Sequence, residues 1–251
     1  MMNIVSINGL SKGFGNRKII DNLNFTVPEG SVFGFVGKNG AGKTTTMKMV
    51  LGLLEPDSGT IDVCGEKVTY GRTSSNHHVG YLPDVPEFYN YMRPLEYLSL
   101  CGEITGLSKN EIKIRSEELL SLVGLGNEKR RIGGFSRGMK QRLGIAQALL
   151  SRPKLLICDE PTSALDPVGR KEILDIMLKI KDSTTVIFST HILSDVERIC
   201  DHVAILNKGS IALSGTLSEI KSMHGKDRLL LELQVMMKFK SLSLVMVLNP
   251  Y

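Results

Sequence analysis

Hydrophobic and polar residues follow two different periods along this chain of 251 residues, and the changes between them divide it into regions. In the first third, apolar residues alternate with polar ones, which is typical of half-buried strands. One run, residues 32–36, is continuously apolar and predicts a strand buried on both faces. A glycine-rich loop and a predicted helix over residues 43–53 follow it. The expected strands are residues 4–10, 19–27, 32–36, 60–63, 67–69 and 79–82, with a hairpin between the fourth and the fifth.

Between residues 93 and 150 the pattern changes to that of helices. Because this block stands between two regions of strands, it predicts an inserted helical subdomain of about residues 85–150. Three helix starts can be recognised from their caps and first turns. They are Pro94, Ser108 with Glu111 three residues later, and Ser136, whose helix we expect to run to Leu150.

After Pro153, strands alternate with helices, which indicates an α/β fold with a mixed sheet. We expect one domain over residues 1–225 and a short C-terminal extension over residues 226–251, either a truncation or a natural variant. Within that extension, residues 229–235 alternate once more, whereas residues 238–251 show no cap or stop. The other expected elements are strands 155–158 and 184–189, helices from Asp166 and over 193–200, and a hairpin of residues 203–206 and 210–213.

Composition adds few constraints to this picture. The chain is 42% hydrophobic and 23% charged, as in ordinary globular proteins. A net charge of +5 is weak evidence for any partner, and the longest basic run has three residues, so no nucleic acid is expected. The cysteines form no C-x-x-C pair and have no accompanying histidine cluster, which argues against a disulfide framework or a structural metal site. They are Cys64, Cys101, Cys158 and Cys200.

The N-terminal residues lack the unbroken apolar stretch of a signal peptide. No run approaches the roughly 18 apolar residues of a membrane helix. We therefore expect a soluble protein whose membrane role, if it has one, comes through a partner.

Residues 37–44, Gly-Lys-Asn-Gly-Ala-Gly-Lys-Thr, match the pattern G-x-x-x-x-G-K-[ST] at every position. Glycines let backbone N–H groups surround phosphate oxygens, and the N-terminus of the following helix favours an anion. Lys43 supplies a charge for the β- and γ-phosphates, and the Thr44 hydroxyl can coordinate Mg²⁺. The motif predicts a P-loop NTPase core. Its candidate nucleotide-binding residues are Gly37, Lys38, Asn39, Gly40, Ala41, Gly42, Lys43, Thr44 and Thr45.

A second predicted strand, residues 155–158, ends in two acids, Asp159 and Glu160. In a parallel α/β sheet the carboxyl ends of the strands face the ligand crevice. We expect Asp159 to face Mg²⁺, and Glu160 to orient or deprotonate the water that attacks the γ-phosphate. Taken alone, such a pair is an ordinary solvated strand end; together with the phosphate loop, the catalytic interpretation is favoured.

Residues 134–142, Gly-Phe-Ser-Arg-Gly-Met-Lys-Gln-Arg, resemble the signature motif of ATP-binding cassette (ABC) proteins, whose usual form is L-S-G-G-Q. Ser136 and Gly138 are retained, whereas the other three positions differ. As a helix cap, Ser136 can offer its hydroxyl and the N–H groups behind it to a phosphate. In the family, that phosphate belongs to ATP on the opposite subunit. Helix capping alone would also explain Ser136.

Further positions match the ABC pattern in the family's order. Phe14 matches the aromatic residue that stacks on adenine, and residues 163–166 resemble the loop that crosses the dimer interface. His191 matches the switch histidine that contacts the γ-phosphate. Each has an ordinary alternative when taken alone, namely a core residue, a capped helix start and a structural histidine. The resemblance covers residues 14–191 and extends through the hairpin near Lys208.

One position departs from the family. ABC proteins usually carry Gln in the loop after the strand at residues 79–82, and this chain has Asp84. A carboxylate can still bind Mg²⁺ or its water, so Asp84 joins Thr44 and Asp159 as a candidate metal ligand. Together with the Met-Lys-Gln-Arg end of the signature, this acid looks similar to cassettes of bacterial multidrug or antibiotic-peptide exporters.

The resemblance implies an ATPase that binds ATP and Mg²⁺ and energises transport through a separate membrane permease, with Lys43, Glu160 and His191 as catalytic residues. It implies a homodimer, or pairing with a related cassette, in the cytoplasm at the inner face of the cell membrane. One alternative is an ABC ATPase that acts on nucleic acid, although the long heptad insertion of that class is not seen between Thr44 and Asp159. The other is a non-hydrolysing regulatory nucleotide binder, against which Glu160 and His191 argue.

Overall fold

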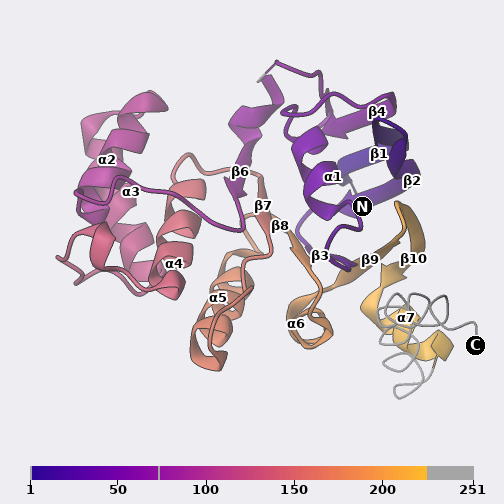
Figure 1. Ribbon diagram of the computed structural model, residues 1–251. Coiled ribbons are helices and arrows are strands. Elements are labelled where there is room, and N and C mark those ends of the chain that lie inside the picture. Colours follow the sequence, from indigo (N-terminus) through magenta and orange to yellow (C-terminus); the bar gives the residue numbers. More distant parts are fainter. Residues whose placement is uncertain (1, 73, 225–251) are drawn as a thin grey trace, which may run out of the picture.

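The computed structural model describes residues 2–72 and 74–224, whose strands form two sheets (Figure 1). The N-terminal sheet has the order β2-β1-β4-β5, and all of its pairs are antiparallel. Its β4–β5 hairpin turns at Cys64 and Gly65, which both have positive φ, as a two-residue hairpin turn that follows the strand twist requires. Its strands are β1 (Asn3–Phe14), β2 (Arg17–Pro28), β4 (Ser58–Val63) and β5 (Glu66–Lys67).

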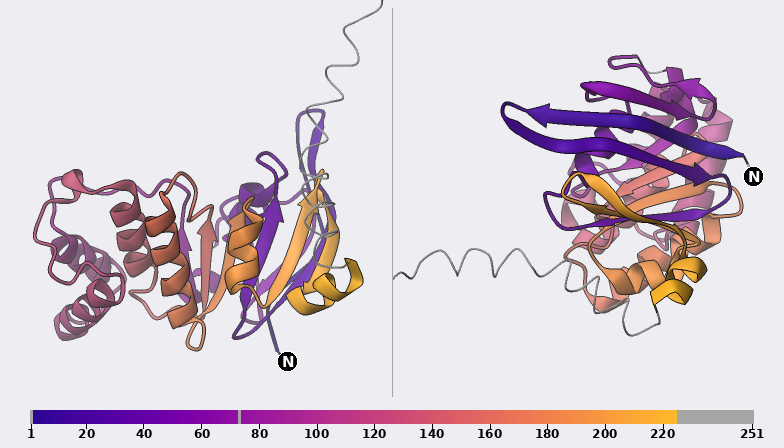
Figure 2. Two further views of the ribbon diagram at one scale, coloured as in Figure 1. Left: turned by 90° about the horizontal axis from the view of Figure 1, so that it is seen from below. Right: turned by 90° about the vertical axis from the view of Figure 1, so that its right-hand side faces the viewer.

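The β1–β2 hairpin is longer than the sequence pattern indicates. Pairing continues to Phe14 opposite Arg17, beyond the end of the expected strand at Leu10. The outer part of the hairpin is exposed or half-buried, so no alternation of apolar residues marks it. Figure 2 shows this hairpin in indigo extending past the rest of the sheet.

The core sheet has the order β10-β9-β3-β8-β7-β6 and is mixed, as predicted. Its strands are parallel except β10, which is antiparallel to β9. Every residue of β3, β7 and β8 is buried, in agreement with their continuous apolar runs. The strands are β3 (Val32–Gly37), β6 (Val79–Leu82), β7 (Leu155–Asp159), β8 (Thr185–Thr190), β9 (His202–Asn207) and β10 (Ser210–Thr216).

Successive residues of the core strands face two hydrophobic clusters, one on each side of the sheet. On β3, for example, Val32 and Val36 belong to the cluster shared with the helices, whereas Phe33 and Phe35 belong to the cluster shared with the N-terminal sheet and α1 (Lys43–Val50). The core sheet is therefore the middle layer of the molecule, and the ends of its strands are fixed from both sides.

Helices α2, α3 and α4 stand together at the end of the molecule away from the N-terminal sheet (Figure 1), where the inserted helical subdomain was predicted. The predicted caps are present: Ser108 and Ser136 each accept a hydrogen bond from a backbone N–H three residues on. The remaining helices are α5 and α6, beside the core sheet, and α7 after β10. Their bounds are α2 (Pro94–Ile104), α3 (Lys109–Leu122), α4 (Arg137–Ala148), α5 (Pro167–Ile180), α6 (Leu193–Ile199) and α7 (Leu217–His224), and the 3-10 turns are η1 (Ser74–His78) and η2 (Ile132–Gly134).

Several helix predictions need correction, among them α4, which ends at Ala148 rather than at Leu150. Helix α1 ends at Val50 rather than at residue 53, because the chain turns at Gly52, whose φ is +66°. Helix α7 was not anticipated, although Thr216 and Glu219 form a reciprocal capping box at its start. The expected strand at residues 229–235 and the extension over residues 226–251 lie outside the described residues.

Within residues 2–72 and 74–224, none of the helices has the length and apolarity needed to cross a bilayer.

Candidate active site

The glycine-rich loop lies between the carboxyl end of β3 and the start of α1, as predicted. Gly42 is the N-cap of α1, with φ of +111° and no side chain to satisfy the first N–H groups of the helix. At Gly37, an added Cβ would lie 2.8 Å from the backbone oxygen of Leu206 on the neighbouring strand. The loop thus presents free helix N–H groups, the usual cradle of a phosphate.

Lys43 folds back over this loop. Its buried ammonium donates to the backbone oxygens of Gly37 at 2.6 Å and Lys38 at 3.1 Å. It also lies 3.0 Å from Oε1 of Glu160, which forms an ion pair. A buried ammonium needs such compensation, since removing it from water is otherwise costly. The result is a fixed positive charge beside the helix start.

The two acids at the end of β7 have different partners. Asp159 accepts hydrogen bonds from the Thr44 hydroxyl and from the Ser189 hydroxyl, both at 2.6 Å. Glu160 has a φ of +48°, a left-handed conformation that turns the chain directly after the strand. Its backbone N–H donates to Ser189 Oγ at 2.9 Å, and its Oε2 lies 2.9 Å from His191 Nδ1. The two acids therefore make different contacts, which suits them to different roles.

Ser189 was not identified from the sequence. It is fully buried in β8 and connects both acids through its one hydroxyl. A hydroxyl inside a wholly buried strand needs hydrogen-bond partners, and that requirement is the signal the sequence offered.

A cavity of about 430 Å³ lies over the loop and the acids. It brings together most of the predicted site residues and Ser163 of the predicted interface loop, and it adds Arg17 and Ile19 to them. Arg17 pairs with Phe14 across the end of the β1–β2 hairpin, a position that the sequence pattern did not reveal. The phenyl ring of Phe14 is half-exposed there. The predicted residues that line the cavity are Phe14, Asn39, Gly40, Gly42, Lys43, Thr44, Thr45, Asp84, Asp159 and Glu160.

Asp84 lies at the cavity and is linked to α4 by two contacts. Arg137 Nη2 lies 3.1 Å from its carboxylate, and the side-chain amide of Gln141 donates to its backbone oxygen at 2.6 Å. Partial burial raises the pKa of the Asp84 carboxyl, and the nearby charges of Asp159 and Glu160 raise it further, while Arg137 opposes both effects. The two departures from the usual family pattern, Asp84 and Arg137, thus contact each other.

Ser136 and Gly138 do not reach this cavity. They line a separate hollow of about 340 Å³, together with residues 164–166 and the start of α5. Ser136 Oγ accepts a hydrogen bond from the N–H of Met139 at 3.3 Å, so it caps α4. Within one chain, the predicted site is therefore in two parts, with the phosphate loop and acids in one and the signature residues in the other.

Comparison with known proteins gives one consistent result. Residues 20–163 match the family model described as ABC transporter. The chain belongs to the ABC transporter family. It is 48% identical over 219 residues to YxlF of Bacillus subtilis, an uncharacterized ABC transporter ATP-binding protein, covering 87% of this chain and 72% of that protein. It is 42% identical to the bacitracin transport ATP-binding protein BcrA of Bacillus licheniformis, covering 91% of this chain and 73% of that protein.

A solved structure supports the same assignment at the level of the fold. The structure of an ATP binding subunit of an ABC transporter matches with a TM-score of 0.81 at 34% identity, covering 92% of this chain and 99% of the other. This agreement confirms the α/β ABC ATPase fold with its antiparallel N-terminal sheet and mixed core sheet. The family match and the relatives confirm the expected function as an ATP-binding, ATP-hydrolysing subunit of an ABC transporter.

Proposed function

We propose that this ABC cassette hydrolyses ATP at the junction between its own phosphate loop and the Ser136 region of a second cassette, either another copy or a related chain. The observation that carries the proposal is the separation of the two half-sites: Lys43 and Ser136 line different hollows of one chain. Each half-site offers one surface suited to phosphate, and within one chain neither half-site is closed by the other. A second subunit that turned its Ser136 towards this loop would complete the site.

In this proposal each residue at the loop has a role of its own. The N–H groups at the start of α1 and the ammonium of Lys43 hold the β- and γ-phosphates. Glu160, buried and held by Lys43 and His191, orients the attacking water and accepts its proton. His191, which lies 2.9 Å from Glu160, would contact the γ-phosphate. Phe14 stacks on the adenine through its exposed ring.

The donor set at the loop also fits Mg²⁺. Thr44 Oγ1 and Asp159 Oδ2 lie 2.6 Å apart, and both are the hard oxygen ligands that this ion prefers. When bound, the ion would neutralise charge on the β- and γ-phosphates. Asp84 would supply a further oxygen from the side of α4 after separating from Arg137.

We further propose that the partner is a separate membrane permease and that the cargo is an antibiotic or a peptide. The functions named for two relatives support the cargo class: bacitracin transport for BcrA, and linearmycin resistance for LnrL of Bacillus subtilis, which is 35% identical. Exposed apolar residues between β6 and the first turn of α2 offer the contact surface. They are Val85, Tyr89, Tyr91 and Leu95.

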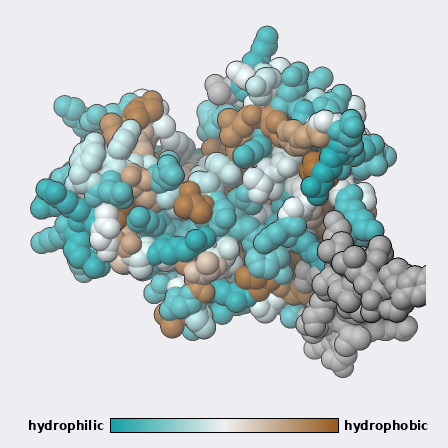
Figure 3. All heavy atoms as spheres, in the orientation of Figure 1, coloured by the Kyte–Doolittle hydropathy of each residue, from teal (hydrophilic) through white to brown (hydrophobic). Residues whose placement is uncertain are grey.

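Figure 3 shows one face of the molecule. The visible face is mostly hydrophilic, with hydrophobic residues gathered in patches, one of them over the corner of the molecule where α2 lies. Exposed aromatic residues are enriched where proteins meet partners, so the exposed residues between β6 and the first turn of α2 are the proposed docking face for the permease.

The test uses Glu160→Gln, which removes the base but keeps the shape of the side chain. With Mg-ATP, this variant should run at twice the chain mass in size-exclusion chromatography with light scattering. Adding Ser136→Glu should restore the monomer, because a carboxylate would repel the γ-phosphate, while ATP binding to each chain is retained. A Glu160→Gln protein that binds ATP and stays monomeric would refute the two-cassette site.

The permease contact is tested separately, by copurification of the chain with membranes of its own cells. Tyr89→Ala and Tyr91→Ala should reduce the bound fraction. Ile104→Ala is the matched control, since Ile104 is an exposed apolar residue of the same subdomain at the other end of α2. Equal loss in all three variants would argue against this docking face.

A further inference from the structure

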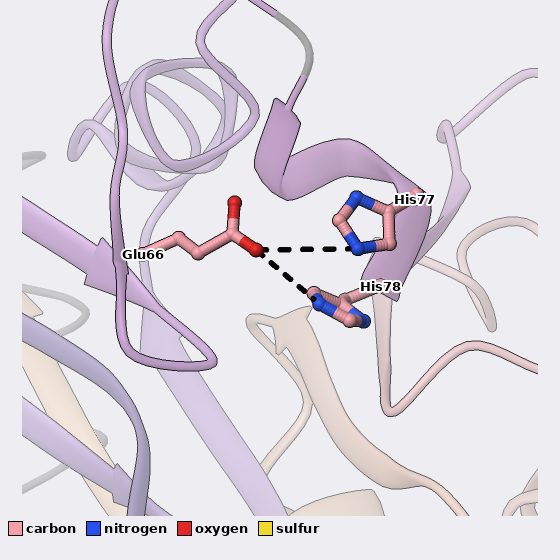
Figure 4. Close-up of side chains that lie close together, drawn as sticks. All are labelled: Glu66, His77 and His78. Atoms are coloured by element: carbon pink, nitrogen blue, oxygen red, sulfur yellow. Dashed lines mark ion pairs between the residues drawn. The ribbon is translucent and has the colours of Figure 1, made fainter.

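A cluster of three metal-ligating side chains lies away from the nucleotide cavity (Figure 4). Glu66 of β5 points towards His77 and His78 of η1, and one ligand atom from each lies within 4.8 Å of the others. Glu66 Oε1 is 3.5 Å from His78 Nε2 and 4.0 Å from His77 Nε2. Nothing in the proposed ATPase mechanism uses these residues.

We propose that Glu66, His77 and His78 bind a divalent transition-metal ion of the Zn²⁺ type. Two imidazoles and one carboxylate are a donor set that zinc takes with three protein ligands and one open position. For bonds of about 2.0–2.2 Å in tetrahedral geometry, the ligand atoms are about 3.4 Å apart. The 3.5 Å between Glu66 and His78 is close to that value, whereas the 4.0 Å between Glu66 and His77 is longer, and the exposed His77 side chain can move the remaining distance.

The contacts of His77 support a ligand role. Its Nδ1 contacts the backbone oxygen of Ser74. A carbonyl oxygen can only accept, so Nδ1 carries the hydrogen and Nε2, which faces Glu66, has its lone pair free in the neutral ring. A backbone carbonyl that fixes the tautomer in this way is the usual outer partner of a metal-bound histidine.

A plain ion pair explains the cluster less well. The two imidazole ring centroids are 3.7 Å apart, so charging both rings beside one carboxylate would place two like charges in contact. A single imidazolium–carboxylate pair at an exposed site would contribute little stability. A bound cation would use both Nε2 lone pairs and the carboxylate at once.

The location would let a bound ion link two segments of the chain. β5 is the edge strand of the N-terminal sheet, and η1 leads directly into β6 of the core sheet. η1 is also tied to the end of α1, since the Asn76 side chain donates to Leu51 O at 3.1 Å. The ion would join the β4–β5 hairpin to the segment between the two sheets. Glu66 and His77 are eleven positions apart and His77 has no histidine neighbour at helical spacing, so no sequence motif announces this site.

Calorimetric titration of tag-free, dialysed protein with ZnCl₂ tests the proposal. We expect one Zn²⁺ ion per chain in nucleotide-free protein, bound equally with and without excess Mg²⁺, because the cluster is separate from Thr44 and Asp159. Glu66→Gln and His78→Gln should each weaken binding at least about tenfold, the loss that removal of even an outer-shell partner causes at metal sites. His202→Gln, a histidine of β9 outside the cluster, is the matched control and should bind like the unmodified chain.

A second measurement needs no variant and so does not depend on folding of the mutants. Zn²⁺ should protect His77 and His78, but not His202, from carbethoxylation, read out by peptide mass spectrometry. Zinc binding that persists in both Glu66→Gln and His78→Gln would overturn the proposal. The absence of saturable binding, or unchanged labelling of His77 and His78, would do so as well.

Discussion

The starts of α1 and α4 are proposed to hold one γ-phosphate from opposite sides, α1 from one cassette and α4 from the second, and they are built differently. Helix α1 begins at a glycine loop, has no side-chain cap, and is surrounded by the buried charges of Lys43, Asp159 and Glu160. Helix α4 begins at Ser136, whose hydroxyl already caps the helix, and its surroundings hold no catalytic acid among the residues that line its hollow. The start of α1 carries the catalytic residues, whereas the start of α4 offers a surface that can close over a nucleotide bound to a second cassette. Substitutions at the start of α1 should therefore remove nucleotide binding or catalysis directly. Substitutions at the start of α4 should act only by preventing the second cassette from closing the site.

The largest effect is expected at Glu160. Replacing it with Gln should lower ATP hydrolysis by about 10²- to 10⁴-fold, the range for loss of a positioned general base. Nucleotide affinity should be nearly unchanged, because Lys43 and the loop amides remain. Phosphate release and binding of a fluorescent nucleotide measure the two quantities. Glu118→Gln, an exposed acid on α3, is the control. Unchanged ATP hydrolysis in Glu160→Gln would show that this carboxylate is not the general base, and the difference proposed between the starts of α1 and α4 would no longer hold.

Lys43 comes next. Lys43→Ala removes the fixed charge and leaves Glu160 without its ion-pair partner. A hydrogen bond to a charged group contributes about 1.5–3 kcal/mol, so ATP affinity should fall roughly 10- to 100-fold. Lys48→Ala, on the exposed side of the same helix, should bind ATP normally. Equal affinities in the two variants would show that the loop amides alone hold the nucleotide.

The sequence was most informative where the site is contiguous. The loop, its lysine and the helix behind it occupy neighbouring positions, and the acids follow a buried strand directly, so local rules of strands, glycines and caps locate them. Of the two signature residues, Ser136 could equally be explained as a helix cap.

Contributions from distant positions could not be read in the same way. Arg17 reaches the cavity because the β1–β2 hairpin pairs beyond its apolar part, and Ser189 joins the acids because β7 and β8 are in register at Asp159. The contact between Asp84 and Arg137 joins residues 53 positions apart. Each of these depends on strand register or helix packing, which periodicity within a segment does not encode.

A smaller effect is expected at Ser136, where the role as helix cap must be distinguished from the proposed contact with the nucleotide of the second cassette. Ser136→Ala should cost about 1 kcal/mol of stability through loss of the cap, and so should Ser108→Ala at the start of α3. Only Ser136→Ala should also lower ATP hydrolysis. Ser136→Asp keeps a good cap and adds a charge against the γ-phosphate, so it should retain stability and lose turnover. Urea unfolding and phosphate release distinguish these cases, and equal hydrolysis in the two alanine variants would reduce Ser136 to a cap.

The smallest effect concerns the ion pair between Asp84 and Arg137, which links the cavity to the start of α4. Its side chains are 48% and 40% exposed, so a double-mutant cycle of Asp84→Asn and Arg137→Ala should give a coupling of no more than about 1 kcal/mol. The pair of Arg198 and Asp175, at 2.9 Å and with 40% and 41% exposure, is a matched reference. Both couplings should vanish at 1 M salt, where the Debye length is about 3 Å. Mg-ATP should change only the first coupling, because Asp84 alone of these four residues lines the cavity. A coupling of several kcal/mol that resists salt and nucleotide would mean that α4 is fixed to the cavity, and the two helix starts would then not act as separate halves.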